Sequence, residues 1–394
     1  MPYALQHNLY IRGTREQAAK QDFVASLRSY VLNDVANELR ERYETQIEPA
    51  MEKAGKEASS GPEVHNALKP DPLFRLYSSI RYNTQEMVWR SVLRPLGENR
   101  AELGKKIDAT THGKTLGSLS IDPNLEIPRN VSAIDVHLAP GSYHREDPKA
   151  PWMAGAVYDH GFSVFSFGMM GENHDDIGQS MSQYIRHKYP EFQPKTIIDV
   201  GCTIGHNTCA WKQSFPDAHV TGLDVAPASL RYAHARAEAQ GTAIDFKQAN
   251  ATALPYDDNS VDVVFSSMFL HELSVKDIRK FLSEANRVLR PGGLMLHMEL
   301  PPNASLEPYD AFYLDWDAYY NNEPFYKAFR DQDIAGLCEE AGFGADKYLQ
   351  FITPQYSMMP KEDYAQAIQQ DHGFSDKTGR FADGIQWFGF GAWK

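Results

Sequence analysis

Residues 197–208 read IIDVGCTIGHNT, an apolar run followed by an acid and two closely spaced glycines. Gly201 and Gly205 can take backbone conformations that other residues disfavour, and they let a ligand lie directly on the main chain. Asp224 stands at the end of the next apolar run, 19 residues after Gly205. A carboxylate there can accept hydrogen bonds from ribose hydroxyls. The pattern therefore predicts a site for an adenosine-type ligand.

Two kinds of cofactor suit such a turn, a dinucleotide and S-adenosylmethionine (SAM). The dinucleotide fingerprint G-x-G-x-x-G keeps its middle glycine so that a pyrophosphate can approach the backbone. This turn reads G-x-x-x-G and has Thr203 at the middle position. A thioether-bearing amino acid needs that glycine less, so we favour SAM. A dinucleotide, or a Rossmann-like domain without a ligand, stays open as an alternative.

The elements that position these residues follow from the hydrophobic pattern. Short apolar runs predict strands at 196–201, 219–225, 244–250, 261–267 and 293–300, and amphipathic segments predict helices at 206–215, 227–240 and 274–289. Such alternation indicates βαβ units and a parallel sheet. Because ligands bind beyond the carboxyl ends of such strands, Asn250 and Ser266 should reach the same edge as Gly201. Residues 347–354 and 385–394 predict a late closing pair of strands.

The N-terminal third has a different, helical pattern. Apolar residues recur at spacings of three and four over 23–43, and residues 73–93 form a second such segment. We expect an α/β protein with a Rossmann-like sheet and an added, mostly helical N-terminal region. Residues 1–150 would form a cap or dimerisation region, and 151–394 the SAM-binding domain. That domain would have a core at 196–300, a substrate-side insertion at 301–345 and closing strands at 346–394.

Further motifs complete an ordered set. Asn250 follows the third predicted strand and precedes a Leu-Pro and an acidic turn, and RVLRPGGLMLH places Pro-Gly-Gly before the fifth strand. Together with the 201–205 turn, this set resembles the class I SAM-dependent methyltransferases, most nearly the ubiquinone and menaquinone biosynthesis type. The resemblance is strongest over 196–300. It implies SAM as cofactor and methyl transfer as the reaction.

The resemblance also implies the residues that hold the cofactor. It assigns the methionine part of SAM to Asp199, Gly201, Cys202 and Gly205, the ribose to Asp224, the adenine to Val225, Asn250 and Ala251, and a further contact to Ser266. The family usually has Asp at position 250, and an asparagine can accept from the adenine amino group through its amide oxygen.

Methyl transfer requires alignment of the acceptor with the sulfonium and, for some acceptors, a general base. His271, just after the fourth predicted strand, is our candidate base or positioning residue, with a packing or capping role weighed equally. The sequence His271-Glu272 is not followed by the second histidine of a metalloprotease motif.

The aromatic and methionine-rich segment 152–176 stands where this family folds a lid, and it supplies Tyr158, Glu172 and His174 as candidate substrate contacts. Most of its Met and Phe residues are expected to be interface core. Asp310, Asp315, Asp317 and Glu323 stand in an aromatic helical segment, where we favour a solvated acidic face over a cation-binding pocket.

Composition narrows the class of protein. A net charge of −13 disfavours a nucleic-acid partner. No apolar run is long enough to span a bilayer, and the first residues lack a secretory pattern. Three scattered cysteines favour neither a disulfide framework nor a metal site, so we expect a cytoplasmic protein without a metal.

We therefore predict a methyltransferase acting on a small organic molecule, aromatic or amine-bearing, for which a homodimer stays open. The alternatives are an enzyme that uses SAM without methylating, by cyclisation or elimination, and a catalytically silent interaction protein of the same fold. A protein substrate also stays open.

Overall fold

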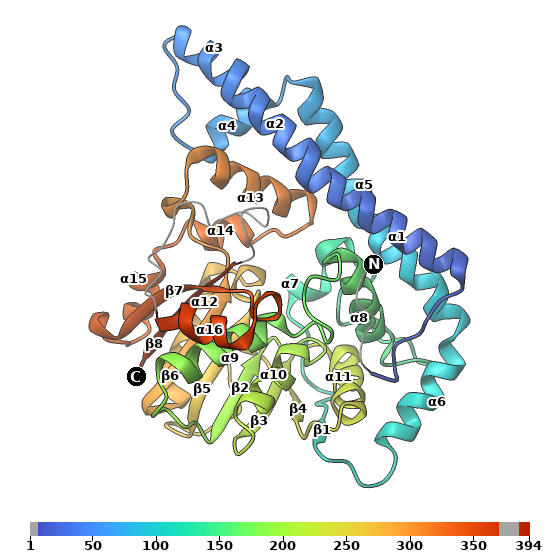
Figure 1. Ribbon diagram of the computed structural model, residues 1–394. Coiled ribbons are helices and arrows are strands. Elements are labelled where there is room, and N and C mark those ends of the chain that lie inside the picture. The colour runs from blue at the N-terminus through green and yellow to red at the C-terminus, as the bar shows by residue number, and fades with distance from the viewer. Residues whose placement is uncertain (1–6, 370–385) are drawn as a thin grey trace.

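The computed structural model describes residues 7–369 and 386–394, and an eight-stranded sheet forms its centre (Figure 1). The strands lie in the order β1-β4-β3-β2-β5-β6-β8-β7. All neighbours are parallel except β8, which runs antiparallel to β6 and to β7. The strands are β1 (Ser118–Ser120), β2 (Thr196–Val200), β3 (His219–Asp224), β4 (Asp245–Gln248), β5 (Val261–Ser267), β6 (Leu289–Glu299), β7 (Tyr348–Pro354) and β8 (Gln386–Trp393). This order confirms the predicted parallel sheet and its closing pair. Residue 385 of the predicted last strand lies outside the described residues.

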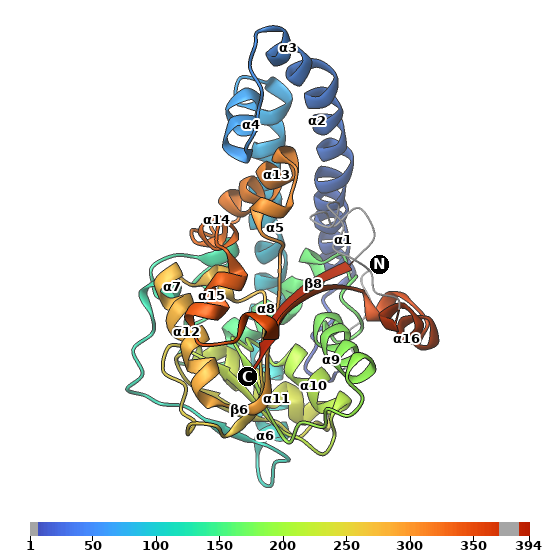
Figure 2. The same cartoon turned by 90° about the vertical axis from the view of Figure 1, so that its left-hand side faces the viewer.

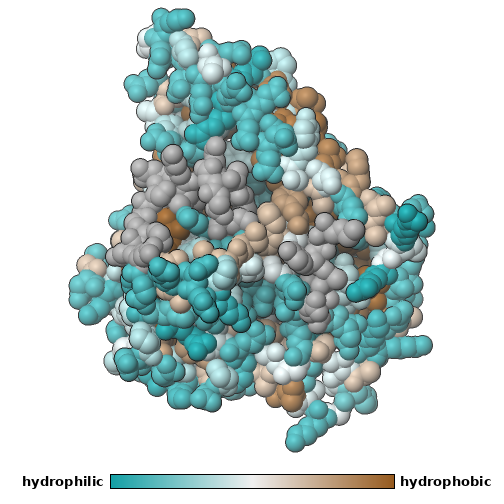
Figure 3. Space-filling model, in the orientation of Figure 1, coloured by the Kyte–Doolittle hydropathy of each residue, from teal (hydrophilic) through white to brown (hydrophobic). Residues whose placement is uncertain are grey.

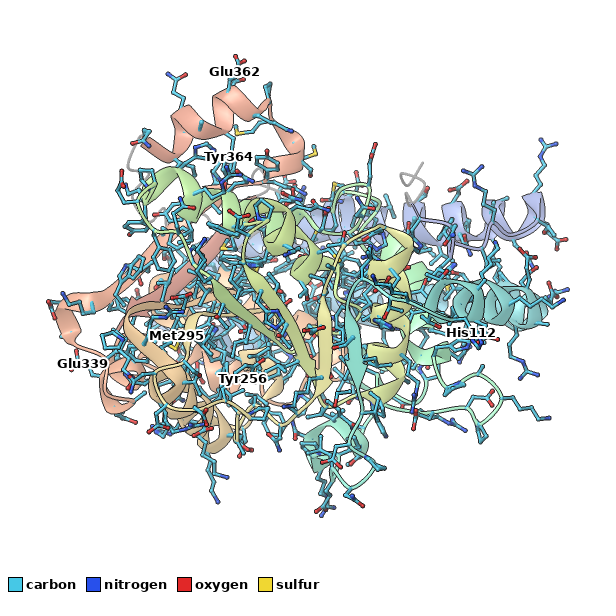
Figure 4. The ribbon with its side chains drawn as sticks, turned by 90° about the horizontal axis from the view of Figure 1, so that it is seen from below. His112, Tyr256, Met295, Glu339, Glu362 and Tyr364 are labelled. Carbon is cyan, nitrogen blue, oxygen red and sulfur yellow. The ribbon has the colours of Figure 1, made fainter. Side chains whose placement is uncertain are left out.

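Helices cover both faces of the sheet. One face packs against α9 (Asp176–Lys188), α10 (His206–Ser214), α11 (Pro227–Ala239) and α16 (Lys361–Gln369), and the other against α12 (Val275–Val288) and α15 (Ile334–Glu340). Seen from below, Tyr364 of α16 lies beside α9 and Met295 lies within the sheet, whereas Glu339 points outward from α15 (Figure 4). The sheet is therefore buried between two layers of helices, as in a Rossmann-like fold.

A long arm of helices rises from this layered part (Figures 1 and 2). Its first rod consists of α1 (Arg15–Tyr30), α2 (Ala36–Arg42) and α3 (Glu48–Lys53), joined by the π-helical turns Val31–Val35 and Tyr43–Ile47. The rod packs against α5 (Pro72–Glu98), and α4 (Gly61–Leu68) and α13 (Pro308–Tyr320) complete the same core. Leu39, Tyr77 and Trp316 are buried there. The N-terminal region is helical, as predicted, and it shares its core with a segment from the second half of the chain.

The structure differs from the sequence prediction in three places. Residues 104–151, whose pattern of Gly and Pro with little periodicity predicts no particular element, contain most of α6 (Arg100–Thr111), the edge strand β1 and α7 (Arg129–Ser132), and α8 (Met153–Phe165) follows them. The aromatic region after residue 306 is divided into α13, α14 (Tyr326–Arg330) and α15. The Pro-Gly-Gly expected to precede the fifth strand lies within β6, because pairing with β5 already begins at Leu289. Strand pairing across the sheet, which a local pattern does not contain, set the bounds of β1 and β6. The domain boundary at residue 150 stays a prediction.

Candidate active site

The turn that follows β2 is bound to the end of β3. The amides of Gly201 and Cys202 both donate to the carbonyl of Leu223, at 2.8 and 3.0 Å. Asp224 accepts from the Thr203 amide at 2.8 Å through Oδ2, and from the Ala226 amide at 2.9 Å through Oδ1. Each carboxylate oxygen keeps a second lone pair. The Asp224 carboxylate is therefore oriented by the backbone and still able to accept from a diol.

The glycines of the turn are required by its conformation and by packing. Gly201 has φ +76° and Gly205 has φ +69°, in the left-handed region that favours glycine. A Cβ on Gly201 would collide with the ring of Phe269, and a Cβ on Gly205 would lie 2.6 Å from Cζ of Phe246. From the sequence pattern, we attributed both glycines to a ligand resting on the bare backbone. The structure adds a packing reason, because aromatic rings of the protein occupy the Cβ positions, and the contact with a ligand stays a prediction.

Other predicted cofactor contacts gather at the same edge of the sheet. Asp199 is buried at the end of β2 and accepts from Thr208 Oγ1 at 2.5 Å. Burial raises the pKa of Asp199 to about 7, against the effect of that hydrogen bond. Asn250 and Ala251 follow β4, and the Ala249 amide donates to the Asp224 carbonyl at 3.0 Å, which joins the ends of β3 and β4. Asn250 Oδ1 already accepts from the amide and the hydroxyl of Thr252.

Ser266 and its neighbour Ser267 point to opposite sides of the sheet. Ser266 is fully buried, and its hydroxyl is 2.7 Å from Nδ1 of His297 on the side of α12. Ser267 accepts from Nδ2 of Asn207 at 2.8 Å, on the side of α10. Side chains alternate along a strand. The structure therefore brings Ser267, rather than the side chain of Ser266, to the turn at 201–205, hereafter called the cofactor turn.

Tyr158 of α8 lies over the turn. Its ring is 5.9 Å from that of His206, the first residue of α10, and forms an edge-to-face pair with Tyr143 at 5.4 Å. Burial, together with the negative charges of Asp159, Glu272 and Asp224, raises the pKa of Tyr158. Tyr158 therefore lies within electrostatic range of both Asp224 and Glu272. Tyr143 was not predicted, since the sequence pattern of residues 104–151 indicates no particular element.

The other two predicted substrate residues lie elsewhere. Glu172 is exposed on the loop before α9. His174 is buried, 3.6 Å from Asp159, in a charge network that also includes His7 and Arg236. Burial lowers the pKa of His174. This network joins the N-terminal segment to α8 and α11, and neither predicted residue takes part in the proposal below.

His271 lies in a buried cluster of carboxylates. Its Nδ1 is 2.6 Å from Oε2 of Glu299, and its Nε2 is 3.9 Å from oxygens of Glu272 and of Glu323. Burial by itself would lower the pKa of His271, but the carboxylates, Glu299 foremost, raise it to about 9. His271 is thus protonated at neutral pH, and a base role at Nε2 requires that this proton be displaced.

His137 completes the cluster from the far side. Its Nε2 is 3.2 Å from Glu272 and its Nδ1 is 3.3 Å from Glu323. The residue has φ +54°, a strained conformation for a histidine. Its carbonyl accepts from Gln85 at 3.0 Å and from Trp89 at 2.7 Å, so α5 holds the backbone in place.

Sequence reasoning missed His137 and Glu299 as site residues, and it assigned Glu323 to the solvated acidic face that we favoured over a cation-binding pocket. A usable signal existed for Glu299, because it ends the strand next to β5 and Ser267 pairs with Met298.

An apolar cavity of about 190 Å³ lies between the arm and the sheet. Its walls come from α1 and the following π-turn, α8, the loop at 166–170, α13 and β8, and Met268 lines it just beyond β5. The apolar lining includes Leu32, Phe162, Phe165, Phe167, Met169, Tyr313, Tyr326 and Trp387, whereas His137 and Glu323 stand among its polar residues. On the face shown in Figure 3, apolar residues form a band where the arm meets the sheet-bearing part. Phe162 connects the cavity to the cofactor turn, since its ring is 5.8 Å from that of His206.

The acidic residues of α13 do not form the solvated face that we favoured. Asp310 pairs with Arg40 at 2.8 Å, Asp317 with Arg81 at 2.5 Å, and Asp315 with Arg330 at 2.9 Å. Glu323 has a side chain only 4% exposed. The prediction was wrong because the arm, distant in sequence, supplies two of these arginines.

Comparisons with known proteins agree with this geometry. A family described as "Methyltransferase domain" matches residues 197–293. Demethylmenaquinone methyltransferase of Thermus thermophilus is 33% identical over 186 residues, which cover 47% of this chain and 76% of the relative. Malonyl-[acyl-carrier protein] O-methyltransferase of Hahella chejuensis is 34% identical over 131 residues, 33% of this chain and 44% of that protein. Phthiotriol/phenolphthiotriol dimycocerosates methyltransferase of Mycobacterium tuberculosis is 33% identical over 117 residues, 30% of this chain and 42% of that protein.

Solved structures are similar over a larger part of the chain, at lower identity. The complex of the Haloferax volcanii Trm112 methyltransferase activator with a putative methyltransferase matches 59% of this chain and 95% of the matched chain, with 16% identity and a TM-score of 0.38. Phosphoethanolamine N-methyltransferase 2 of Haemonchus contortus matches 59% of this chain and 57% of its own, with 18% identity and a TM-score of 0.39.

The chain belongs to the class I SAM-dependent methyltransferase family, and SAM is its cofactor. The predicted family and activity are confirmed. The chain spans less than half the length of several relatives it matches. Among the described residues, no helix has the length and apolar character needed to cross a membrane.

Proposed function

We propose that this methyltransferase acts on a small, largely apolar organic molecule with one polar reacting group, held in the cavity between the arm and the sheet. The observation that carries the proposal is the composition of the cavity wall, which is mostly aromatic and methionine side chains and includes His137 and Glu323 of the histidine–glutamate cluster among its polar residues. Apolar walls with a few convergent polar groups are typical of small-molecule sites. The names of two relatives refer to demethylmenaquinone and to phthiotriol dimycocerosates.

The residues at the sheet edge would hold the cofactor. SAM supplies an electrophilic methyl group on a sulfonium. Asp224 would accept from the ribose hydroxyls, and Asp199 would face the charged methionine part. Met268 and Phe162 line the cavity, and Phe162 also contacts His206 beside the turn, so these apolar side chains would exclude water from the reacting atoms. His137 and Glu323 would orient the polar group of the acceptor.

A labelling experiment tests this function. The full chain is incubated with SAM that carries a deuterated methyl group and with the low-molecular-mass fraction of a cell extract, and products are identified by mass spectrometry. We expect a small molecule to gain the deuterated methyl group with wild-type protein, and Asp224→Ala to abolish the transfer. SAM consumption without a labelled product would indicate the cyclising or eliminating alternative. The absence of SAM binding in calorimetry would indicate the silent alternative, and label on protein alone would contradict the proposal.

A further inference from the structure

We propose that Glu272, Glu323 and Nε2 of His271 bind one divalent transition-metal ion on the wall of the cavity. His137 is a fourth ligand of this ion or a neighbour of the two glutamates that bind it. No metal was expected from the sequence, because these residues are separated in the chain and the only local motif, His271-Glu272, is incomplete. The structure assigns the site by bringing together side chains from three parts of the chain. His137, Glu272 and Glu323 offer ligand atoms that all lie within 4.8 Å of one another.

The distances around His271 suit an ion. Nε2 is 3.9 Å from Oε1 of Glu272 and 3.9 Å from Oε2 of Glu323, too long for hydrogen bonds. Metal–ligand bonds of about 2.0–2.2 Å place neighbouring ligand atoms roughly 3–4 Å apart. Three atoms separated in this way can therefore share one ion after small side-chain movements.

The orientation of His271 is an independent observation that points to a ligand. The residue is 2% exposed, and Nε2 has no hydrogen bond to any of the described residues. Its Nδ1 is bonded to Glu299, which also accepts from the amides of Phe269 at 2.8 Å and Leu270 at 2.6 Å. A carboxylate fixed in this way holds a proton at Nδ1 and directs Nε2 into the cluster, where an ion would take the place of the proton on Nε2. Metal-binding histidines are oriented by the same kind of contact.

The charges of the cluster also favour a cation. Glu272, Glu299 and Glu323 are three carboxylates around two imidazoles, and no lysine or arginine among the described residues forms an ion pair with them. Buried carboxylates require compensating charge. Mixed imidazole and carboxylate ligands suit first-row transition metals such as Zn²⁺ better than Ca²⁺ or Mg²⁺. An ion at this point replaces the proton of Nε2, which is released to solvent.

The position of the ion on the cavity wall would allow it to act on the methyl acceptor. His137 and Glu323 line the cavity, so the ion would face the acceptor and could bind its oxygen or nitrogen. This use rests on the proposed function. The binding itself does not, since it can be measured without acceptor or SAM, and the two proposals can fail separately.

The test is metal binding by the full chain. Protein stripped with a chelator is titrated with Zn²⁺ against a coloured competitor, and Co²⁺ is added as a spectroscopic probe. We expect one equivalent per chain and visible Co²⁺ absorption. His271→Gln and Glu323→Gln should each weaken Zn²⁺ binding by roughly 100-fold, whereas the exposed control Glu340→Gln should leave it unchanged.

A second variant tests the positioning by Glu299. Glu299→Gln should keep one equivalent but weaken Zn²⁺ binding by roughly 10- to 100-fold and shift the Co²⁺ spectrum. Circular dichroism and thermal unfolding identify any variant that fails to fold, in which case Glu272→Gln replaces it. Two outcomes would overturn the proposal. One is that the wild-type chain binds less than a tenth of an equivalent of Zn²⁺, and the other is that the wild type and all folded cluster variants bind Zn²⁺ with equal affinity.

Discussion

The carboxylate of Asp224, at the end of β3, accepts a hydrogen bond of 2.8 Å from the amide of Thr203 in the turn after β2. One side chain thus fixes the cofactor turn and also presents the acceptor atoms proposed for the ribose. Removing the carboxylate should loosen the turn. An asparagine keeps only one of the two oxygens that accept from the Thr203 and Ala226 amides, so it should disturb the turn as well.

Asp224→Asn should weaken SAM binding. Hydrogen bonds to a charged group contribute about 1.5–3 kcal/mol each, so the expected loss is roughly 10- to 100-fold in Kd, and Asp224→Ala should lose at least as much. Calorimetry with S-adenosylhomocysteine measures the change. Asp245→Asn, on the neighbouring strand β4, is the matched control and should bind normally. Equal affinity in the Asp224 variants and the control would remove Asp224 from the cofactor site.

Gly205→Ala should destabilise the fold more than Gly55→Ala does. Both glycines have nearly the same φ, +69° and +68°, so both substitutions introduce left-handed strain. At Gly205 the added methyl group also meets the ring of Phe246, whereas nothing lies within 4 Å of it at Gly55. We expect an extra loss of about 1–3 kcal/mol in the free energy of unfolding, measured in urea. A difference near zero would show that the ring moves aside freely.

Asp199 should make stability depend on pH. Its pKa in the folded protein is about 7, whereas that of an unfolded aspartate is about 3.9. The folded state therefore holds a proton that the unfolded state has released, and rising pH favours unfolding. Relative to Asp199→Asn, the wild-type free energy of unfolding should fall by about 1.4 kcal/mol for each pH unit between roughly pH 5 and pH 7, then level off. Urea unfolding at several pH values measures this difference, and parallel profiles would contradict it.

Leu32→Trp should raise the KM for the methyl acceptor without changing the affinity for SAM. Leu32 lies in the π-turn after α1 and lines the cavity, so a larger side chain narrows it. Once the acceptor is identified, we expect its KM to rise by roughly 10-fold or more, as for a loss of about 1–3 kcal/mol of pocket complementarity. Glu38→Trp places the same side chain on an exposed position of α2 and serves as control. A rise of KM in both variants, or in neither, would show that the arm does not form part of the acceptor site.

The sequence by itself determined the sheet and its cofactor edge. Strand and helix periods are local, and parallel strands bring their carboxyl ends to one edge, so the pattern alone was enough to place Gly201, Asp224 and Asn250 together. Such reasoning also located His271, because it directly follows a predicted strand. It did not reveal the packing at the glycines, since the rings of Phe246 and Phe269 reach the turn only in the folded chain.

Only the tertiary structure decided the partners of His271 and the shape of the cavity. His137 reaches the cluster from an irregular segment held by Gln85 and Trp89 of α5, and Glu323 reaches it from the end of α13. Arginines of the arm neutralise acids that the sequence pattern assigns to solvent. These contacts join residues that are far apart in the chain, and their geometry depends on how the arm packs on the sheet. Local periodicity has no information about that packing.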